Sequence, residues 1–353
     1  MNRPGFPFGS AMNKYILNNS AYQQWFASRF TVTTFANEMK WYTNEYAPGK
    51  DNYFEADGML QYAKKNNIDV RGHNIFWDDP AYQPYWVNSL SPDQLNSAAE
   101  NRVNSVVSRY KGQLIGWDVV NENLHFSFFE SKLGQKFSAR MFNEVHNIDG
   151  QTTLFLNEYN TIEDSRDGLS SPPSYIQKIK EIQSSNKQLP LGIGLESHFP
   201  NSPPNLPYMR ASLDTLTATG LPVWITELDV ANQPNQVEYF EQVLREAHSH
   251  SGIQGIVMWT SFSPEDCKIC LVDNNFKNLP AGDVVDKLIS EWGRKTVSGT
   301  TDENGFFKAS LFHGDYEMKI SHPVKKNYTF THQLQVLSKD KSKKTTQFIQ
   351  LSI

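Results

Sequence analysis

The sequence predicts an α/β protein, a (β/α)8 TIM barrel followed by a small all-β appendage at the C-terminus. From about residue 5 to residue 294, short apolar runs alternate eight times with longer amphipathic segments, a pattern typical of βα units around a parallel sheet. Eight such units within about 290 residues match the usual size of a TIM barrel. After Trp292 the helix-length periodicity ends. We therefore expect a barrel domain over residues 1–295 and a β-rich domain over residues 296–353.

The expected strands are short apolar runs that span residues 6–11, 30–37, 69–77, 114–121, 153–157, 191–196, 223–229 and 253–259. The helix-like segments that follow them span residues 20–28, 55–67, 91–110, 137–148, 174–186, 205–219, 235–250 and 282–294. Two helices carry a start signal. Ser91 precedes Pro92, so a capping hydroxyl stands before a proline at the first helical position, and Ser174 precedes another apolar-periodic run.

The C-terminal segment shows the alternation of short strands. We expect strands at residues 306–310, 316–320 and 348–352, with a turn at Glu303, Asn304 and Gly305. The basic run at residues 339–344 is interpreted as a solvated loop rather than a patch for an anionic polymer. The aromatic residues of this segment suit a small core, so we favour a structural cap over a carbohydrate-binding domain.

Composition and charge exclude several classes of function. The 353 residues carry a formal net charge of −5 and a pI near 6.0, so the chain lacks the basic field that would gather nucleic acid. No run approaches the roughly 18 to 20 consecutive apolar residues of a spanning helix, so no membrane association is expected. We expect an uncharged or weakly charged partner and, by default, a monomer. The 22 Phe, 15 Tyr and 8 Trp offer flat faces for stacking on sugar rings as well as for core packing.

The only two cysteines, Cys267 and Cys270, form a single CxxC sequence. A four-ligand zinc site needs two more thiolate or imidazole ligands, and no second CxxC or HxxxH motif supplies them, so no metal site is expected. A redox motif is weakly indicated because the strand-to-helix context is missing. A local disulfide between Cys267 and Cys270, or two free loop thiols, remain the preferred alternatives.

Polar side chains recur where the expected strands end. Carboxylates, imidazoles and amides occupy corresponding positions in successive units, at Asn37, His73, Asn121, Glu122, Asn157, Glu158, Glu196, His198, Glu227, Asp229 and Trp259. The carboxyl ends of the strands are the face of a TIM barrel that carries chemistry. Ordinary loop polarity would instead give scattered Ser, Asp and Gly. The sequence therefore predicts a lined cleft at this face.

Two carboxylates, Glu122 and Glu227, each end an apolar strand. A buried Glu is costly unless it has partners or a chemical role. Two carboxyl groups that face each other across a cleft are the minimal apparatus for cleaving a glycosidic bond, since one protonates the leaving oxygen and the other attacks or assists at the anomeric carbon. Their separation, which decides between retention and inversion, is not given by the sequence.

Five motifs extend this hypothesis, and in sequence order they are NEMKW, VRGHNIFW, WDVVNE, GIGLESHF and WITELDV. Together they resemble glycoside hydrolase family 10 over about residues 5–294, and the phrase at residues 270–276 resembles its plant members. The resemblance implies a retaining endo-β-1,4-xylanase that acts on xylan or xylo-oligosaccharides without metal or organic cofactor. It also implies secretion to the cell wall, with which the sequons at Asn18 and Asn327 are compatible. The start of the chain, Met1 to Gly5, lacks the segments of a signal peptide.

The resemblance also assigns roles to single residues. Glu122 corresponds to the acid/base, and Asn121 to the amide that bonds the sugar hydroxyl beside the reacting carbon. Glu227 corresponds to the nucleophile, and His198 and Asp229 to the pair that orients it. The roles require a raised pKa at Glu122 and a low pKa at Glu227.

The remaining matches are expected to contact the substrate. Lys40, His73 and Trp77, with Asn37, match sugar contacts on the glycone side, and Trp259 matches the aromatic floor at the cleavage point. Asn157, Glu158 and Tyr159 are expected to form cleft wall. The chain departs from the family pattern in three places: Ala36 replaces a sugar-binding Glu, Glu196 stands where many relatives have Gln, and the loop after residue 259 lacks a second Trp.

Two alternative functions stay open at this stage. A xylan endotransglycosylase would use the same glycosyl-enzyme intermediate and would make products longer than the donor. A non-catalytic polysaccharide-binding protein on the same fold would be expected to have lost Glu122 or Glu227, and both are present.

Overall fold

The structure is a computed structural model that describes residues 5–200, 202–232, 234–259, 261–264, 269–293, 297–309, 314–321 and 329–336. Residues 7–285 form one compact unit, and the chain from residue 286 belongs to a second. The predicted boundary between residues 295 and 296 stays a prediction. Among the described residues, no helix is both long enough and apolar enough to span a membrane.

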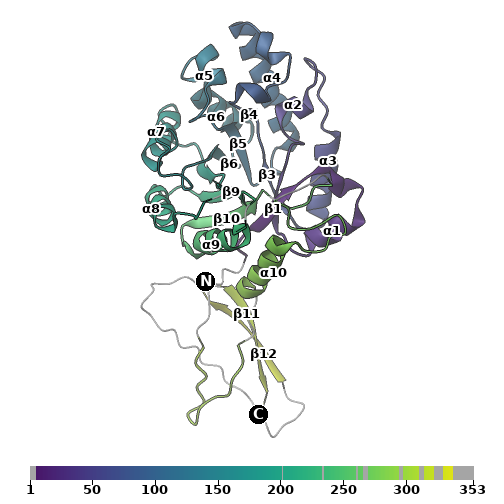
Figure 1. Ribbon diagram of the computed structural model, residues 1–353, viewed down its shortest axis with the longest axis vertical. Helices are drawn as coiled ribbons and strands as arrows, with labels where there is room; N and C mark the ends of the chain where they lie inside the picture. The colour runs from purple at the N-terminus through teal and green to yellow at the C-terminus, as the bar shows by residue number, and fades with distance from the viewer. Residues whose placement is uncertain are drawn as a thin grey trace. The chain divides into compact units, whose positions relative to one another are not determined.

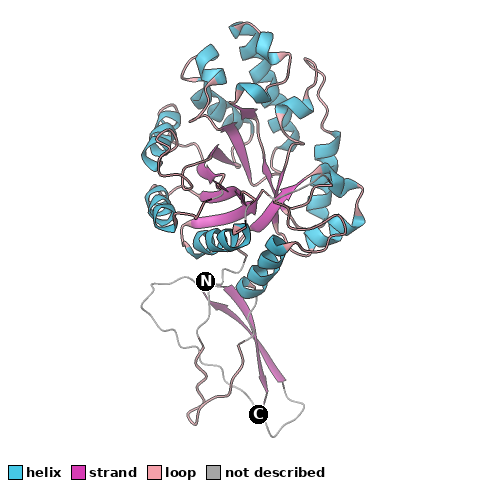
Figure 2. Ribbon diagram, viewed as in Figure 1, coloured by secondary structure: helices cyan, strands magenta, loops and turns pink. Residues whose placement is uncertain are grey.

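Eight parallel strands form a closed barrel, as the sequence predicts, and helices surround them (Figures 1 and 2). The strands are β1 (Phe8–Met12), β2 (Val32–Phe35), β3 (Asp69–Gly72), β5 (Gly116–Asn121), β6 (Thr153–Glu158), β7 (Leu191–Leu195), β9 (Val223–Val230) and β10 (Ile253–Met258). The barrel closes because β10 pairs with both β9 and β1. Two short strands, β4 (Phe76–Trp77) and β8 (His198–Phe199), pair with β5 and β9.

The predicted strand at residues 69–77 is interrupted, because β3 ends at Gly72 and β4 begins only at Phe76. His73 lies in this interruption, where its side chain is turned toward the carboxyl ends of the neighbouring strands and contacts Asp118 of β5. Similarly, β7 ends at Leu195 and β8 begins at His198. Strand alternation alone does not reveal either break.

The helices of the first unit lie on the outside of the barrel (Figure 2). They are α1 (Ser20–Ala27), α2 (Trp41–Asn44), α3 (Phe54–Lys65), α4 (Pro92–Tyr110), α5 (Phe128–Leu133), α6 (Phe137–Ile148), α7 (Pro172–Gln183), α8 (Leu206–Thr217) and α9 (Gln236–Ser249). A further helix, α10 (Pro280–Trp292), begins in the first unit and continues into the second. Ser91 and Gln94 form a reciprocal capping box at the start of α4, which confirms the start signal. Helix α7 begins at Pro172, so Ser174 does not start it. The sequence did not predict α2 and α5.

The core of the barrel includes a cluster of Val32, Phe155, Trp224 and Val257, which come from β2, β6, β9 and β10. Trp224 fits because Gly255 stands beside it on β10. A Cβ atom at Gly255 would lie 2.3 Å from the Trp224 ring. Arg71 stacks on this cluster, with its guanidinium 4.7 Å from the centre of the Phe155 ring. The apolar cluster is thus followed directly by the charged residues Arg71 of β3 and Asp118 of β5.

Arg102 of α4 ties together the loops that follow β2 and β3. Its buried guanidinium donates to the carbonyls of Met39, Asn74 and Ile75. It also donates to Asn44 Oδ1 at 3.2 Å. These loops carry Lys40 and His73. The Arg102 guanidinium, which stays charged, therefore holds in place both loops that carry predicted site residues.

Asp78 provides a stability test, because its carboxyl is fully buried behind β4. Oδ1 accepts from the Phe129 N–H at 2.9 Å, while Oδ2 has no partner among the described residues. Burial raises the pKa of Asp78 to about 7. The carboxyl therefore binds its proton more tightly when folded. Its contribution to stability is present below the unfolded pKa, near 3.9, and is lost as pH rises through about 7.

Replacing Asp78 by Asn keeps the acceptor for Phe129 and removes the ionisation. We expect Asp78→Asn to stabilise the fold at pH 8 by on the order of 2–4 kcal/mol and to have little effect near pH 4.5. Thermal unfolding at both pH values measures the difference. An equal change in Tm at the two pH values would show that ionisation of Asp78 does not govern the effect.

In the second unit, β11 (Gly314–Ser321) pairs antiparallel with β12 (Thr329–Val336). The predicted strand at residues 316–320 is confirmed within β11, and the turn near Gly305 is confirmed by its φ of +81°. The prediction of a strand over residues 306–309 is wrong, because these residues have no strand partner in the described part of the chain. The sequence did not predict β12. The predicted strand at 348–352 and the basic run at 339–344 lie outside the described residues.

Candidate active site

The carboxyl ends of β5, β6, β7 and β9 bring the predicted polar residues together around Asn157. The Asn157 Nδ2 atom donates to Glu227 Oε1 at 2.8 Å, Asn121 Oδ1 at 2.9 Å and Glu196 Oε1 at 3.1 Å. Its Oδ1 accepts from the Thr226 hydroxyl at 2.6 Å. Asn157 is fully buried. It is therefore the centre of the polar network rather than an exposed part of the cleft wall.

This arrangement requires a glycine on β7. A Cβ atom at Gly194 would lie 2.4 Å from Asn157 Oδ1 and would displace the amide from its three carboxylate and amide partners. The glycine of the sequence GIGLESHF thus has a specific role, since it lets β7 approach the polar network closely.

Glu227, on β9, is buried among groups that favour its ionised form. Burial by itself would raise the pKa of Glu227, but His73, His198 and Lys40 outweigh it and hold that pKa at about 2. His73 Nδ1 lies 3.7 Å from Glu227 Oε1, and His198 Nε2 lies 3.7 Å from Glu227 Oε2. With the Asn157 amide on Oε1 as well, the carboxylate is charged and fixed in orientation, as a nucleophile requires.

His198 occupies the position beside Glu227 that the sequence predicts. Its Nδ1 lies 3.1 Å from Asp229 Oδ2, and its Nε2 lies 3.5 Å from Glu196 Oε2. Burial lowers the pKa of His198, but Asp229 and Glu227 reverse this effect and raise the pKa well above its ordinary value. The imidazole is accordingly a cation that bridges three carboxyl groups. Glu196, His198 and Glu227 also have the ligand types of a small cation site. The His198 cation is the simpler source of positive charge there.

Glu122 follows β5 in a left-handed backbone conformation, with φ of +58°. Such a conformation is costly for a residue other than glycine and is typical of functional sites. Here it is held by a hydrogen bond from the Glu122 N–H to the Asn157 carbonyl at 2.9 Å. Asn121 Nδ2 lies 3.3 Å from Glu122 Oε1. Burial raises the pKa of Glu122 to about 8, and the nearby Glu158 and Glu227 carboxylates add to this effect. Glu122 is thus a protonated acid at neutral pH.

The predicted sugar contacts lie near these two carboxyls. Lys40 Nζ lies 4.6 Å from the centre of the Trp77 ring and 5.6 Å from that of Trp259. Asn37 Oδ1 accepts from Lys40 Nζ at 3.2 Å. The His73 and Trp259 rings meet edge to face at 5.2 Å. Their roles in binding sugar stay predictions.

A comparison with known protein families decides which family this site belongs to. Residues 1–286 match the family described as "Glycosyl hydrolase family 10". The chain belongs to glycosyl hydrolase family 10. The match covers the strands that carry Glu122 and Glu227, so the motifs that suggested the family lie within it.

Curated relatives of this family 10 chain include two proteins of Arabidopsis thaliana. Endo-1,4-beta-xylanase 5 is 44% identical over 344 residues, which cover 95% of this chain and 60% of that protein. Endo-1,4-beta-xylanase 4 is 42% identical over 352 residues, which cover 95% of this chain and 61% of that protein. The chain thus spans about 60% of the length of these relatives. Among solved structures, xylanase 10B from Thermotoga petrophila in complex with xylobiose has a TM-score of 0.71 at 23% identity, covering 81% of this chain and 94% of that one. This similarity supports the fold.

Behind the predicted site residues lie buried charged residues that the sequence did not reveal. Behind His73, the buried Asp118 carboxylate accepts from His73 Nδ1 at 2.9 Å and pairs with Arg71 Nη2 at 2.6 Å. Glu163 Oε1 accepts from the backbone N–H of His198 at 3.0 Å. A charged side chain within an apolar strand, such as Arg71 or Asp118, is a usable signal because it requires a buried partner. Glu163 lies in a polar loop and gives no such signal.

Glu158 corrects one expectation for the cleft wall. It is fully buried, and its Oε1 lies 2.6 Å from His125 Nδ1. His125 Nε2 in turn lies 2.9 Å from Asp167, and the His125 ring stacks on Tyr159 at 3.8 Å. Glu158 therefore supports the loop that carries Tyr159, and it does not itself line the cleft. Burial lowers the pKa of His125, but Glu158 and Asp167 outweigh this effect and raise that pKa to about 9.

Of the two cysteines, the structure describes only Cys270. Cys270 is buried and is no free thiol. Cys267 lies outside the described residues, so the pairing of the two cysteines stays a prediction.

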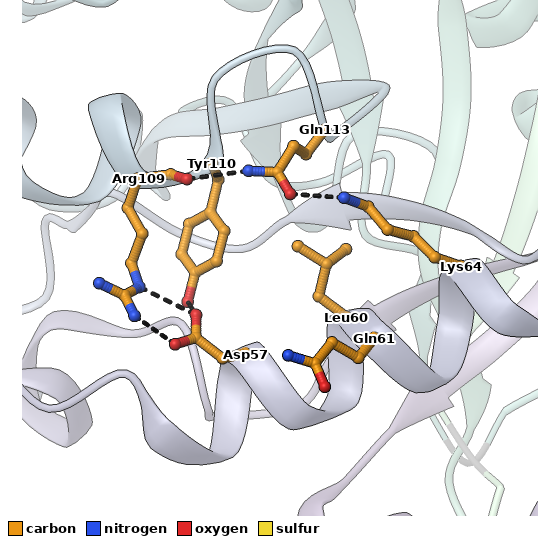
Figure 3. A pocket seen from close by; sticks show the side chains of 7 residues that line it. All are labelled: Asp57, Leu60, Gln61, Lys64, Arg109, Tyr110 and Gln113. Carbon is orange, nitrogen blue, oxygen red and sulfur yellow. Dashed lines mark hydrogen bonds and ion pairs between the residues drawn. The ribbon is translucent and has the colours of Figure 1, made fainter.

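A pocket of about 330 Å³ lies between α3 and α4 (Figure 3). Its polar groups bond to one another. Arg109 pairs with Asp57, the Tyr110 hydroxyl donates to Asp57 at 3.1 Å, and Lys64 donates to Gln113. None of the predicted site residues lines it. Since most of its polar groups already bond to one another, the pocket gives no specific indication of a polar ligand.

Glu196 gives a test of protonation inside the cleft. Burial, followed by the neighbouring Glu227 and Glu122 carboxyls, raises the pKa of Glu196 well above its ordinary value, which favours the neutral form of this side chain. We expect Glu196→Gln to keep kcat/KM within about threefold at pH 6, because glutamine has the same shape and is neutral. Glu196→Ala should lose about 10- to 100-fold, since it removes one acceptor each from the Asn157 and His198 donors and leaves a void beside Glu227. Equal losses in the two variants would show that the ionised form is needed.

Proposed function

We propose that this family 10 chain is a retaining endo-β-1,4-xylanase that hydrolyses internal β-1,4-xylosidic bonds by double displacement. One observation carries the proposal. Glu122 and Glu227 are joined by two amides, with distances of 3.3 Å from Glu122 Oε1 to Asn121 Nδ2, 2.9 Å from Asn121 Oδ1 to Asn157 Nδ2, and 2.8 Å from Asn157 Nδ2 to Glu227 Oε1. An acid and a charged carboxylate are thus held in one rigid network.

In the first step, a Glu227 oxygen attacks the anomeric carbon while the bond from that carbon to the glycosidic oxygen breaks. Glu122 gives its proton to the departing oxygen, and a covalent xylosyl ester forms on Glu227. Asn121 is placed to hydrogen-bond the neighbouring sugar hydroxyl, a bond that strengthens as positive charge develops on the ring. In the second step, Glu122 takes a proton from water, the water oxygen bonds to the anomeric carbon, and Glu227 leaves with retention of configuration.

The two pKa shifts define the working range of pH. Glu227 must be charged and Glu122 protonated, so activity should be bounded by the pKa values of about 2 and about 8. The names of the curated relatives, endo-1,4-beta-xylanases of Arabidopsis thaliana, support xylan as the substrate. Among the described residues, none of these contacts specifically favours transglycosylation or a non-catalytic role.

The test is a time course on reducing-end-labelled xylohexaose, with cellohexaose as the control for sugar selectivity. We expect shorter products only, formed in the β configuration and absent with Glu227→Ala. Products longer than six units would indicate a transglycosylase. An absence of turnover by the wild-type chain, or an equal rate on cellohexaose, would contradict the proposed substrate.

We also propose that the chain acts as a monomer outside the cell, at the plant cell wall. Xylan is a cell-wall polysaccharide, and the sequon at Asn18 is exposed, as a glycan acceptor must be. Expression in a plant secretory system, followed by treatment with a glycan-releasing enzyme, tests this location. A mass near 40.4 kDa by light scattering on the deglycosylated protein is expected for a monomer.

A further inference from the structure

His125 lies between two carboxylates, on the turn that carries Glu122. Its Nδ1 lies 2.6 Å from Glu158 Oε1, and its Nε2 lies 2.9 Å from Asp167 Oδ2. The other oxygen of each carboxylate accepts from a backbone N–H group. Since an ionised carboxylate only accepts hydrogen bonds, both nitrogens of the His125 ring must carry a proton. His125 is therefore an imidazolium, in agreement with its pKa of about 9.

The Glu158–His125 pair joins the turn after β5 to the end of β6. Glu158 Oε2 accepts from the Leu124 N–H at 2.8 Å, two residues after Glu122. The backbone N–H of His125 bonds to the Glu122 carbonyl at 3.3 Å. Glu122 itself is in the left-handed region, where a residue with a Cβ atom is strained. Such a conformation persists only when surrounding contacts fix it, and Glu158 and His125 supply two of them.

The imidazolium also holds the loop that follows β6. Its ring stacks on Tyr159, with 3.8 Å between the ring centres and 11° between the planes. Asp167 Oδ2 accepts from Asn160 Nδ2 at 2.9 Å as well as from His125. The titratable groups that face the His125 ring are thus Glu158 of β6 and, in the loop after it, Tyr159 and Asp167. One cation links the Glu122 turn to all three.

We propose that the His125 imidazolium is a positioning residue for the acid, because it fixes the Glu122 turn against β6 and so places the Glu122 carboxyl at the departing oxygen. This inference rests on the proposed function, since it gives His125 a part in the protonation step. His125 acts through Glu122 and exchanges no proton with the substrate. A displacement of about 1 Å in a reacting group can cost about 10²-fold in rate, so the loss of such a clamp should be measurable.

His125→Gln removes the clamp, and His250→Gln is its matched control. A glutamine amide has one donor group and one acceptor, so it can satisfy only one of the two carboxylates around His125. His250 is also buried beside a carboxylate, with its Nε2 3.0 Å from Asp214 Oδ1. Its Nδ1, however, accepts from the Gly252 N–H at 3.1 Å. Glutamine offers the donor and the acceptor that this second site uses.

The first measurement compares phenyl and dinitrophenyl β-xylobiosides, which share their sugars and differ in the leaving group. Departure of phenol needs the proton of Glu122, whereas departure of dinitrophenol does not. The readout is kcat/KM for the phenyl substrate divided by kcat/KM for the dinitrophenyl substrate. At pH 6 we expect His125→Gln to lower this ratio about 10- to 100-fold and to keep the dinitrophenyl value within about threefold. His250→Gln should leave the ratio within about twofold.

The second measurement follows the same ratio against pH in Asp167→Asn. The clamp requires the His125 cation, which is present below the His125 pKa and lost above it. Removing one of its two carboxylates lowers that pKa, so the fall in the ratio should move to lower pH by roughly one unit relative to the wild type. Asp164→Asn removes the same charge from the same loop, but Asp164 pairs with Arg166, so this variant should leave the midpoint in place.

Equal losses on the two substrates in His125→Gln, an unchanged ratio, or an equal fall in His250→Gln would overturn the proposal, because His125 would then have no specific effect on protonation. If circular dichroism shows that His125→Gln is unfolded, Asp167→Asn decides alone, and an unmoved midpoint overturns the proposal. If the wild-type chain turns over neither substrate, the proposed function itself fails, which is a different outcome from the others.

Discussion

Replacing Glu227 by Ala is expected to lower kcat/KM on xylan by at least about 10⁴-fold, since the covalent path loses its nucleophile. The Asn157, His73 and His198 groups that now surround the carboxylate would remain around an empty volume. A small anion such as azide should enter it and attack an activated aryl β-xyloside from the Glu227 side. The anomeric carbon bonds to azide as the aryl group departs, so the product is the α-xylosyl azide. Product configuration is read by NMR.

Glu227→Gln is the control for this result, because it keeps the volume filled. It should be as inactive as Glu227→Ala and should not respond to azide. Circular dichroism at matched concentration checks that both variants are folded. A β-configured azide product from Glu227→Ala would mean that the attacked face, and thus the role of Glu227, is misassigned.

Glu122→Ala is expected to show a loss that depends on the leaving group. On xylan the departing sugar oxygen needs a proton, so kcat/KM should fall about 10²- to 10⁴-fold. On a dinitrophenyl β-xyloside the leaving group needs no proton, so formation of the xylosyl ester should be nearly as fast as in the wild type. Its hydrolysis lacks the base, so a burst of dinitrophenol followed by a slow steady state should appear in stopped-flow measurements.

The same variant tests the pKa of the acid. The alkaline limb of the wild-type profile, expected near the Glu122 pKa of about 8, should disappear in Glu122→Ala on the activated substrate. Asp78→Asn is the matched control, because it removes another carboxyl whose pKa is raised but which lies behind β4. This substitution should leave the alkaline limb in place. Equal losses of Glu122→Ala on xylan and on the activated substrate would contradict the acid/base role.

The sequence predicts those parts of the fold whose signal is local. Eight apolar runs give eight barrel strands, and Glu122 and Glu227 are recognisable because each ends an apolar run. The capping box of Ser91 and Gln94 lies within four residues. In each case the residues that create the feature are neighbours in the chain, so the pattern contains the information.

The features that the sequence did not predict depend on partners far apart in the chain. Asn157 was expected in the cleft wall, but its contacts with Glu227 and Asn121 span 70 and 36 residues and place it at the centre. From the sequence, Arg102 is indistinguishable from an exposed arginine of an amphipathic helix. Its role depends on the loops after β2 and β3, whose carbonyls it binds in the folded chain. The error at residues 306–309 has the same origin, since an alternating pattern becomes a strand only when another strand pairs with it.

The pairing of β1 with β10 has a consequence for how the protein is made. The Ser10 hydroxyl donates to the Met258 carbonyl at 3.1 Å across 248 residues, and this contact joins the first and last strands of the barrel. Glu122 and Glu227 are both synthesised before that last strand, so the barrel cannot close around them until it has been made. The cleft therefore forms only after Ile253–Met258 has been synthesised, and a growing chain should not cleave polysaccharide in the compartment where translation begins.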